Sequence, residues 1–435
     1  MADADMIYVI LICAFSCLGM VVAAVLRPEM RIRSVRMSTY WMMTSVGALL
    51  LILFRFISIG DVHTGLTGDG SINPVKILLL FISMTLLSIF LDETGFFRYL
   101  ANAVLRRSGS GQMKLFTAFF ITISVLTIFT SNDIIILTFT PFICYFAKNA
   151  KIDPVPYLIM EFVAANTASM LLIIGNPTNI YLATSHGIDF IDYLSVMALP
   201  TVAAVIAAYI MLFFLFRKKL RSPISASVTD ATIEQKTLLT IGLLLLSVCT
   251  VMLALSSYLN IEMYLVASVS ALILFVLALI ASIVSRRSPE ELGRTLKRVP
   301  WGIVPFVISM FILVLALEKV GATADLGGLF GDDNVFVYGF ASALFSNAIN
   351  NIPMSVLFTS ITIGAGGSPS IVYASVIGSN IGAFLTPIGA LAGILWLSIL
   401  KDNGIDFSFM RFVRYGVIVV IPVLSAALIG LALVT

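Results

Sequence analysis

Charge is scarce in this chain of 435 residues: Asp, Glu, Lys and Arg together make up 11% of it, whereas hydrophobic residues make up 60%. An average soluble protein has about a quarter of its residues charged. The mean hydropathy is +1.07. A soluble chain could not bury so much apolar surface, because the hydrophobic core of a single domain stops growing well below 435 residues. The composition excludes a soluble enzyme, a nucleic-acid-binding protein and a secreted disulfide scaffold. It predicts a polytopic membrane protein in a lipid bilayer.

Cysteine and histidine are also rare. The four cysteines lie in apolar runs without a Cys-x-x-Cys pair, so neither a disulfide nor a zinc site is predicted. The two histidines, His63 and His186, fall in polar loops, which excludes a buried histidine relay. The sequence has no nucleophile–base pair, metal cluster or Gly-rich ATP-binding motif. It therefore predicts neither an enzyme nor a bound cofactor or metal.

Long apolar runs fill most of the chain. A membrane helix needs about 20 apolar residues, and single spans are predicted at 6–26, 39–58, 75–91, 193–216, 236–257, 263–284, 301–318 and 412–434. Two longer runs, 155–185 and 370–400, contain polar interruptions that predict broken helices. Two further regions, 113–147 and 335–363, are interrupted near their middle. The predicted fold class is an all-α polytopic membrane protein.

Lys and Arg gather in alternate loops, which contain 23 of the 26 basic residues, while the opposite loops are acidic. Basic loops lie on the cytoplasmic side of a membrane. This pattern places a polar linker, 217–236, in the cytoplasm and both termini outside. We expect a multi-pass protein of the bacterial plasma (inner) membrane. The N-terminus lacks the basic segment of a cleaved signal peptide, so the first run is predicted to remain as a helix.

The same charge pattern predicts two re-entrant hairpins. Lys114 and Lys148 flank the first interrupted region and both belong inside, so that segment enters and leaves on one side, with its tip at the Ser-Asn-Asp sequence 131–133. Segment 335–363 is predicted to enter from outside, with its tip near the Ser-Asn sequence 346–347. Non-helical backbone at such depth is either buried in protein or lines a wet cavity.

The two halves of the chain resemble each other. The Ser-Asn pair of the first hairpin recurs in the second at an offset of 215, and segment 165–180 matches 379–394 at an offset of 214, with five identities in 16 positions. The charge pattern gives the halves opposite orientation. We therefore predict two inverted repeats, 1–216 and 237–435, each with one hairpin and one broken helix. Paired interrupted helices in inverted halves indicate a transport site near the membrane midplane.

The helix breaks define the chemistry of this site. Where a helix unwinds, NH groups and carbonyls become free, and nearby side chains add donors and oxygens. Gly175 with Pro177, and Gly389 with Pro387, are predicted to produce the breaks. With them, the predicted substrate- or ion-binding residues are polar side chains of both tips and both breaks: Ser131, Asn132, Asp133, Asn166, Thr167, Asn176, Thr178, Asn179, Ser346, Asn347, Asn350, Asn351, Asn380 and Thr386. The alternative is that they only satisfy backbone groups and let helices pack closely.

Two carboxylates lie deep within the predicted spans, Asp133 at the first tip and Glu161 near the start of 155–185. Ionisable groups inside a membrane are functional candidates by default, so both are candidates for carrying a coupling proton. The alternatives are that Asp133 caps the second leg of the hairpin and that Glu161 lies shallow. No Lys or Arg is near the predicted site in the sequence. This favours a neutral or cationic substrate, although helix ends alone can hold an anion.

Five segments resemble the arsenite–antimonite efflux pumps, the arsenical-pump membrane proteins of the ion transporter superfamily. They are LDETGFF (91–97), TSNDIIILTFTPF (130–142), NTAS (166–169), NNIP (350–353) and VIGSNIGAFLTPIGALAGILWLSIL (376–400). The resemblance implies about ten transmembrane helices plus two hairpins, with neutral arsenous acid leaving in exchange for protons. Some members dock a soluble arsenite-stimulated ATPase, which is the one protein partner that the resemblance suggests.

Two features depart from the pattern of that family. Its members carry Asp where Asn166 and Asn380 stand here, so two intramembrane acids are missing. Segment IIGNPTN (173–179) resembles the sodium–dicarboxylate branch of the superfamily. The leading prediction is a secondary transporter that exports arsenite or antimonite in exchange for protons by alternating access. The alternatives are a sodium-coupled dicarboxylate or oxyanion symporter and a cation–proton antiporter. A passive channel fits inverted repeats less well.

Overall fold

The computed structural model describes residues 2–26, 29–32, 35–67, 73–109, 111–221, 235–286, 288–331, 333–366 and 368–435. Most of the predicted linker 217–236 lies outside these described residues.

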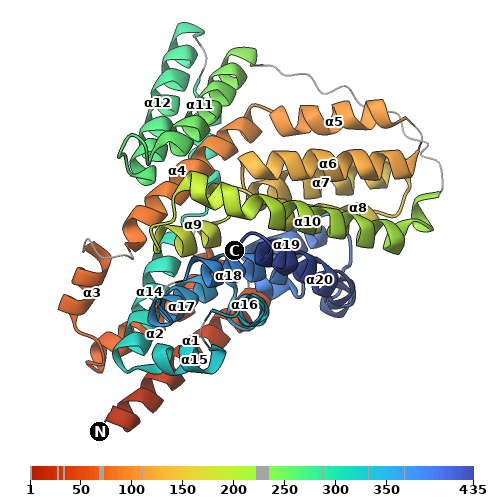
Figure 1. Ribbon diagram of the computed structural model, residues 1–435. Helices are drawn as coiled ribbons and strands as arrows, with labels where there is room; N and C mark the ends of the chain where they lie inside the picture. Colours follow the sequence, from red (N-terminus) through yellow and green to blue (C-terminus); the bar gives the residue numbers. More distant parts are fainter. Residues whose placement is uncertain are drawn as a thin grey trace.

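The described chain is helical almost throughout (Figure 1). The longer helices are α1 (Ala2–Leu26), α2 (Tyr40–Leu53), α4 (Pro74–Glu93), α6 (Gln112–Phe129), α7 (Asn132–Ala150), α8 (Val155–Ala168), α10 (Phe190–Phe216), α11 (Lys236–Leu255), α12 (Met263–Val284), α14 (Ile303–Lys319), α16 (Val335–Ile349), α17 (Asn351–Gly364), α18 (Pro369–Gly382), α19 (Leu391–Asp402) and α20 (Phe409–Ala432). The shorter ones are α3 (Ile59–Thr67), α5 (Phe96–Ser108), α9 (Pro177–Thr184), α13 (Glu290–Arg298), α15 (Ala322–Phe330) and the 3-10 helices η1 (Ile173–Gly175), η2 (Lys219–Arg221) and η3 (Pro387–Gly389).

All eight predicted single spans are helices, and eight stretches of the described chain are long and apolar enough to cross a membrane. The multi-pass membrane class is therefore confirmed. The span predicted at 39–58 is shorter than expected, because α2 ends at Leu53 and the chain turns at Arg55 with φ 62°. The sequence prediction also missed a short antiparallel pair, β1 (Glu29–Ile32) and β2 (Val35–Ser38).

Each of the four interrupted regions is divided into two main helices. Region 113–147 forms α6 and α7, and region 335–363 forms α16 and α17. The two long interrupted runs each form a helix, a 3-10 turn and a second helix: α8–η1–α9 in one and α18–η3–α19 in the other. Short amphipathic helices such as α5, with Arg106 and Arg107 in its last turn, were predicted as loops, because an amphipathic helix has little net hydropathy.

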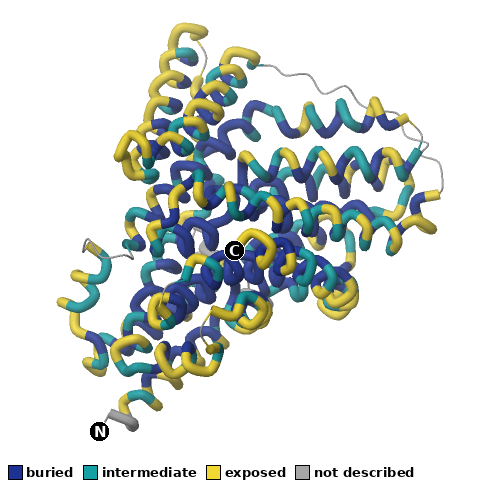
Figure 2. Tube along the Cα trace, in the orientation of Figure 1, coloured by how far each residue is buried: buried dark blue, intermediate teal, exposed yellow. Residues whose placement is uncertain are grey.

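Burial is distributed as expected for a protein whose solvent is lipid. Every residue of α8 is buried, and buried segments gather at the centre of the molecule in Figure 2. A helix that is buried all round belongs to a core. By contrast, α12 exposes Leu272 and Ile283 to about two-thirds of their full area, at 65% and 66%. Such apolar outer faces suit contact with hydrocarbon, while the polar residues lie inside.

The two halves are packed against each other. The helix α19 packs along α7, and α18 packs against α8 and α9, while α16 packs along α18 and α10 along α20. The pair α11 and α12 lies at one end of the molecule beside α4 (Figure 1). The hairpins and the broken helices therefore meet in the buried centre.

Candidate functional site

The first helix break separates α8 from α9. Asn176 caps α9, because its Oδ1 accepts the backbone N–H of Thr178 at 3.2 Å, and Pro177 needs no such partner. Gly175 is required in the break, because a Cβ there would collide with the carbonyl oxygen of Ser169. The residues singled out from the sequence thus form this break.

The second break, between α18 and α19, is held from another helix. Asn347 of α16 reaches into it, and its Oδ1 accepts the backbone N–H of Thr386 at 3.0 Å and the Thr386 hydroxyl at 2.6 Å. The Asn347 Nδ2 donates to the carbonyls of Ala343 and Gly382, both at 2.8 Å. Gly389 leaves room for this contact, because a Cβ there would lie 2.7 Å from Asn347 Oδ1. The second hairpin therefore fixes the second break.

The first hairpin turns between α6 and α7, at the predicted Ser-Asn-Asp sequence. Ser131 caps α7 by accepting the backbone N–H of Ile134 at 3.4 Å. The alternative that Asp133 is the cap is therefore wrong.

The second hairpin turns at Asn350, which has a φ of 75° and caps α17 by accepting the backbone N–H of Ile352 at 3.3 Å. The prediction of a tip near 346–347 is wrong by about one helical turn. The reason is that Ser346 stays in α16, where its hydroxyl donates to the Ser342 carbonyl at 2.8 Å. The Asn350 Nδ2 points to the second break and donates to the carbonyl of Ile388 at 3.0 Å.

Asn380 of α18 is the centre of a hydrogen-bond network that joins the halves. Its Oδ1 accepts from Asn176 Nδ2 at 2.8 Å and from the Ser169 hydroxyl at 3.0 Å. Its Nδ2 donates to Asn179 Oδ1 at 2.7 Å and to the Val376 carbonyl at 2.9 Å. All of these side chains are buried. We call this set, with Asn132 and Asn166, the amide network.

Further hydrogen bonds complete the amide network. The Asn132 Nδ2 at the first hairpin tip donates to Asn166 Oδ1 at 2.9 Å, and the Asn166 Nδ2 donates to the carbonyl of Phe162 at 2.8 Å. The Ser379 hydroxyl donates to Thr178 Oγ1 at 3.1 Å. The Ser169 hydroxyl also donates to the Asn166 carbonyl at 2.9 Å, so the first tip, the first break and α18 are linked through neutral groups only.

Three buried oxygens of the predicted substrate- or ion-binding residues have no hydrogen-bond partner in the described part of the chain: Asn132 Oδ1, Thr167 Oγ1 and Asn351 Oδ1. A buried polar group without a partner costs about 1–3 kcal/mol. A solute that supplies hydrogen-bond donors would be stabilised at these positions.

The sequence prediction missed two members of the network, Ser169 and Ser379. A signal for Ser379 exists, because it precedes Asn380 just as Ser131 precedes Asn132. Ser169 lies in the NTAS segment, but nothing in the sequence indicates that its hydroxyl faces the other half.

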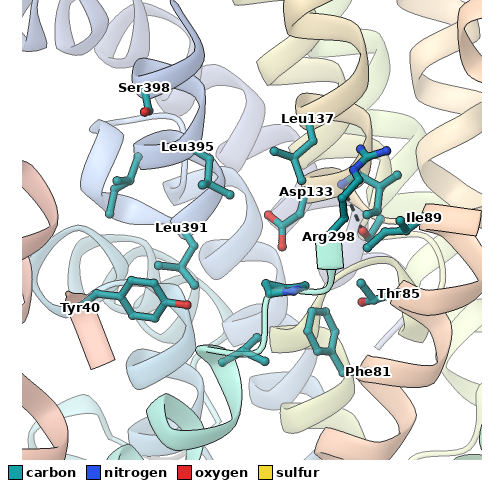
Figure 3. A pocket seen from close by; sticks show the side chains of 15 residues that line it. Tyr40, Phe81, Thr85, Ile89, Asp133, Leu137, Arg298, Leu391, Leu395 and Ser398 are labelled. Carbon is teal, nitrogen blue, oxygen red and sulfur yellow. Dashed lines mark hydrogen bonds between the residues drawn. The ribbon is translucent and has the colours of Figure 1, made fainter. Parts of the chain in front are cut away.

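Asp133 does not join the amide network. It lines a separate cavity of about 110 Å³ between α4, α7, the start of α14, and α19 (Figure 3). The walls are mostly apolar, with Phe81 and Leu391 among them, and the hydroxyls of Thr85 and Ser398 add polar groups. No hydrogen bond or ion pair of the Asp133 carboxylate occurs among the described residues. We call this space the Asp133 cavity.

Arg298, at the end of α13, lines the Asp133 cavity as well (Figure 3). Its Nη1 lies 2.6 Å from Asp92 Oδ2 and 2.6 Å from Glu93 Oε1, while Arg294 Nε lies 2.7 Å from Glu93 Oε2. The prediction that no Lys or Arg lies near the site is therefore wrong for this cavity. Arg298 is distant from Asp133 in the sequence, but it reaches the Asp133 cavity because α13 folds back onto the end of α4. The Arg298 guanidinium is already paired with the carboxylates of Asp92 and Glu93.

Glu161 is fully buried, so its side chain does not reach the protein surface. Its Oε1 accepts the Thr140 hydroxyl at 2.8 Å, and it belongs neither to the amide network nor to the Asp133 cavity. Within the part of the chain that the structure describes, no group of three or more His, Cys, Asp or Glu side chains could hold a metal ion.

A multi-pass helical fold with a buried polar network at paired helix breaks is the architecture of a membrane transporter. A protein-family model described as citrate transporter matches residues 32–378. The arsenical pump membrane protein of Escherichia coli K12 is 33% identical over 380 residues, which cover 81% of this chain and 85% of that protein. The chain therefore belongs to the citrate transporter family together with the arsenical pump membrane proteins, and the resemblance stated from the sequence is confirmed.

A more distant relative and a solved structure are also similar to this chain. A putative arsenical pump membrane protein of Bacillus subtilis is 27% identical over 410 residues, covering 86% of this chain and 90% of that protein. The crystal structure of the YdaH transporter of Alcanivorax borkumensis covers 99% of this chain and 98% of its own, with a TM-score of 0.56 and 12% identity. At that identity the likeness concerns the fold alone.

Proposed function

We propose that this protein is a secondary active transporter that exports arsenite or antimonite in exchange for protons. The observation that carries the proposal is the uncharged amide network that joins the first break to α18, together with the unpaired oxygens Asn132 Oδ1 and Thr167 Oγ1. Arsenous acid is a neutral molecule with three hydroxyl groups, so it can donate to such acceptors and needs no countercharge. The Asp133 cavity nearby supplies a carboxylate for the proton.

The order of the elements supports an inverted repeat. The first half has α4, Gly95, α5, the hairpin α6–α7, the broken helix α8–η1–α9 and then α10. The second half has α14, Gly321, α15, the hairpin α16–α17, the broken helix α18–η3–α19 and then α20. Gly95 and Gly321 both take left-handed backbone, with φ of 81° and 84°. Alternating access would then be a movement of these repeats around the site between them.

The second candidate is a sodium-coupled carboxylate symporter. It is favoured by the description of the matching family model as citrate transporter and by the backbone N–H groups at the start of α19, which no side chain caps. Helix N-termini can bind carboxylates. The unpaired carboxylate of Asp133 argues against an anion in that cavity.

Transport in inside-out membrane vesicles separates the two candidates. We expect radiolabelled arsenite to accumulate when the vesicle interior is acid, and the accumulation to vanish when a protonophore removes the pH gradient. Radiolabelled citrate with a sodium gradient is the comparison. Sodium-dependent citrate uptake without arsenite uptake would refute the proposal and support the symporter.

The membrane orientation is open to a direct test by cysteine labelling. The four native cysteines are buried, so they should not react with a membrane-impermeant maleimide. We expect D189C, in an exposed loop on the acidic side, to label in intact cells, and D402C, exposed at the end of α19, to label only after the membrane is permeabilised. The reverse labelling result would contradict the proposed orientation, in which the basic loops are cytoplasmic and both termini are external.

A further inference from the structure

A buried carboxyl group and a buried indole meet away from both the amide network and the Asp133 cavity. Glu161 of α8 and Trp396 of α19 are each 0% exposed. The Glu161 Oε1 accepts the Thr140 hydroxyl at 2.8 Å, but its Oε2 has no hydrogen-bond partner among the described residues. The Trp396 Nε1 also has none among them, and the Trp396 ring contacts Phe162, the residue that follows Glu161 in α8. One unsatisfied acceptor and one unsatisfied donor thus lie together in the core.

The surroundings of this pair are aromatic. The Trp396 ring contacts Phe162 at 5.6 Å, Phe407 at 5.1 Å and Phe412 at 5.5 Å between ring centroids. An ionised carboxylate with one unpaired oxygen is expensive in such an environment. A neutral carboxylic acid is tolerated there, because one oxygen keeps the Thr140 hydrogen bond and the other carries the proton.

Among the described residues, no ion pair of Glu161 occurs. The Cys144 thiol of α7 also lies near its carboxyl group. The charged side chains on the elements that pack against α8 and α19 are Lys114, Asp133, Lys148, Asp192, Lys401, Asp402, Arg411 and Arg414, and all are exposed except Asp133 and Arg411. Arg411 lies over the Phe407 ring, 5.0 Å from its centroid.

We propose that Glu161 and Trp396 form a proton-binding site that is separate from Asp133. Protonation of Glu161, in the first half of the chain, is linked through this site to the position of α19, in the second half. The proton binds to Glu161 Oε2. When this proton leaves, the ionised Oε2 draws the Trp396 N–H into a charge-assisted hydrogen bond, which is stronger than a neutral one. The ionised form therefore holds α19 against α8, and the protonated form releases it.

The link reaches the second break directly. The helix α19 begins at Leu391, immediately after the turn that Asn347 and Thr386 hold together. A shift of α19 at Trp396 is thus transmitted along a rigid helix to the centre of the protein. Its role in transport rests on the proposed proton exchange, whereas the binding of the proton does not.

Tryptophan fluorescence of the purified full-length protein tests the site without any substrate. The chain has three tryptophans, so W41F combined with W301F leaves Trp396 as the only reporter. Between about pH 5 and about pH 10, a range that covers strongly shifted carboxyl groups, we expect its emission to follow the binding of one proton. The variant E161Q should lose this change entirely. The variant D133N, which removes the other deep carboxylate, should keep it.

A second variant covers the case in which E161Q fails to fold. In T140V the hydrogen bond to Oε1 is gone, and because that bond favours the ionised form, the fluorescence midpoint should move to higher pH. Three results would overturn the proposal: an unchanged pH titration of Trp396 fluorescence in E161Q, a titration with an unshifted midpoint in T140V, or a fluorescence change that follows sodium at constant pH. If the fluorescence titration is found but no arsenite is transported, the proton-binding site is supported and the proposed substrate is wrong.

Discussion

Replacing Asp133 by asparagine is expected to reduce pH-driven arsenite uptake to the level of vesicles without the protein. Asparagine keeps the shape of the side chain but has no proton to exchange. The fold should survive, because Ser131 and not Asp133 caps α7. The loss of a negative charge from the first turn of a helix costs about 0.3–1 kcal/mol. The measurement is uptake at several pH values, normalised to the amount of protein in the membrane.

Asp61 offers a matched control on the surface. Hydrogen bonds from Lys319 and from Ser58 lower the pKa of Asp61 to about 2, so it stays ionised throughout such an assay. The variant D61N should therefore leave the pH dependence of transport unchanged. If D133N also keeps the pH dependence of the parent protein, Asp133 does not carry the coupling proton, and that role passes to Glu161 or to sodium.

The sequence was sufficient to predict where helices break, because breaks depend on local chemistry. Gly175 has no room for a side chain, and Asn176 followed by Pro177 is a strong helix start. These signals depend only on residues close in the sequence, so they can be recognised without knowledge of the tertiary structure. The inward placement of polar residues was predictable for the same reason, since buried polar groups in a membrane need partners.

The directions of side chains and the contacts between distant segments were not predictable. Asn132 and Asp133 are adjacent, yet successive residues of a helix point about 100° apart, so one enters the amide network and the other lines a cavity. Arg298 reaches that cavity only because α13 packs onto α4. The second hairpin tip was misplaced because the repeated Ser-Asn pair was taken to mark the turn, which the backbone of Asn350 makes instead.

The network also explains why position 380 requires an amide. The Asn179 Nδ2 donates to the backbone carbonyls of Ser169 and Leu172, at 2.8 Å and 3.2 Å. Carbonyls only accept, so the orientation of Asn179 is fixed and its Oδ1 faces Asn380. Position 380 must therefore supply a donor, which an amide has and a carboxylate lacks.

The variant N380D is accordingly expected to be strongly destabilised at neutral pH. The carboxylate could still accept from Asn176 and Ser169, but it would repel the oxygens of Asn179 and Val376, to which the amide now donates. A broken buried polar pair costs about 3–5 kcal/mol when a charge is left uncompensated. Acidification should restore much of the loss, because a protonated carboxyl group regains one donor for Asn179. The measurement is the unfolding temperature in detergent as a function of pH.

The variant N380A separates charge from lost contacts. It removes the same hydrogen bonds without adding a charge, so its unfolding temperature should be lower than that of the parent by an amount that does not change with pH. Only N380D should recover in acid. If N380D is as stable as the parent at neutral pH, the amide orientation deduced from the Ser169 and Leu172 carbonyls is wrong. A recovery of N380D with sodium instead of acid would indicate that a metal cation, and not a proton, neutralises a carboxylate at this position.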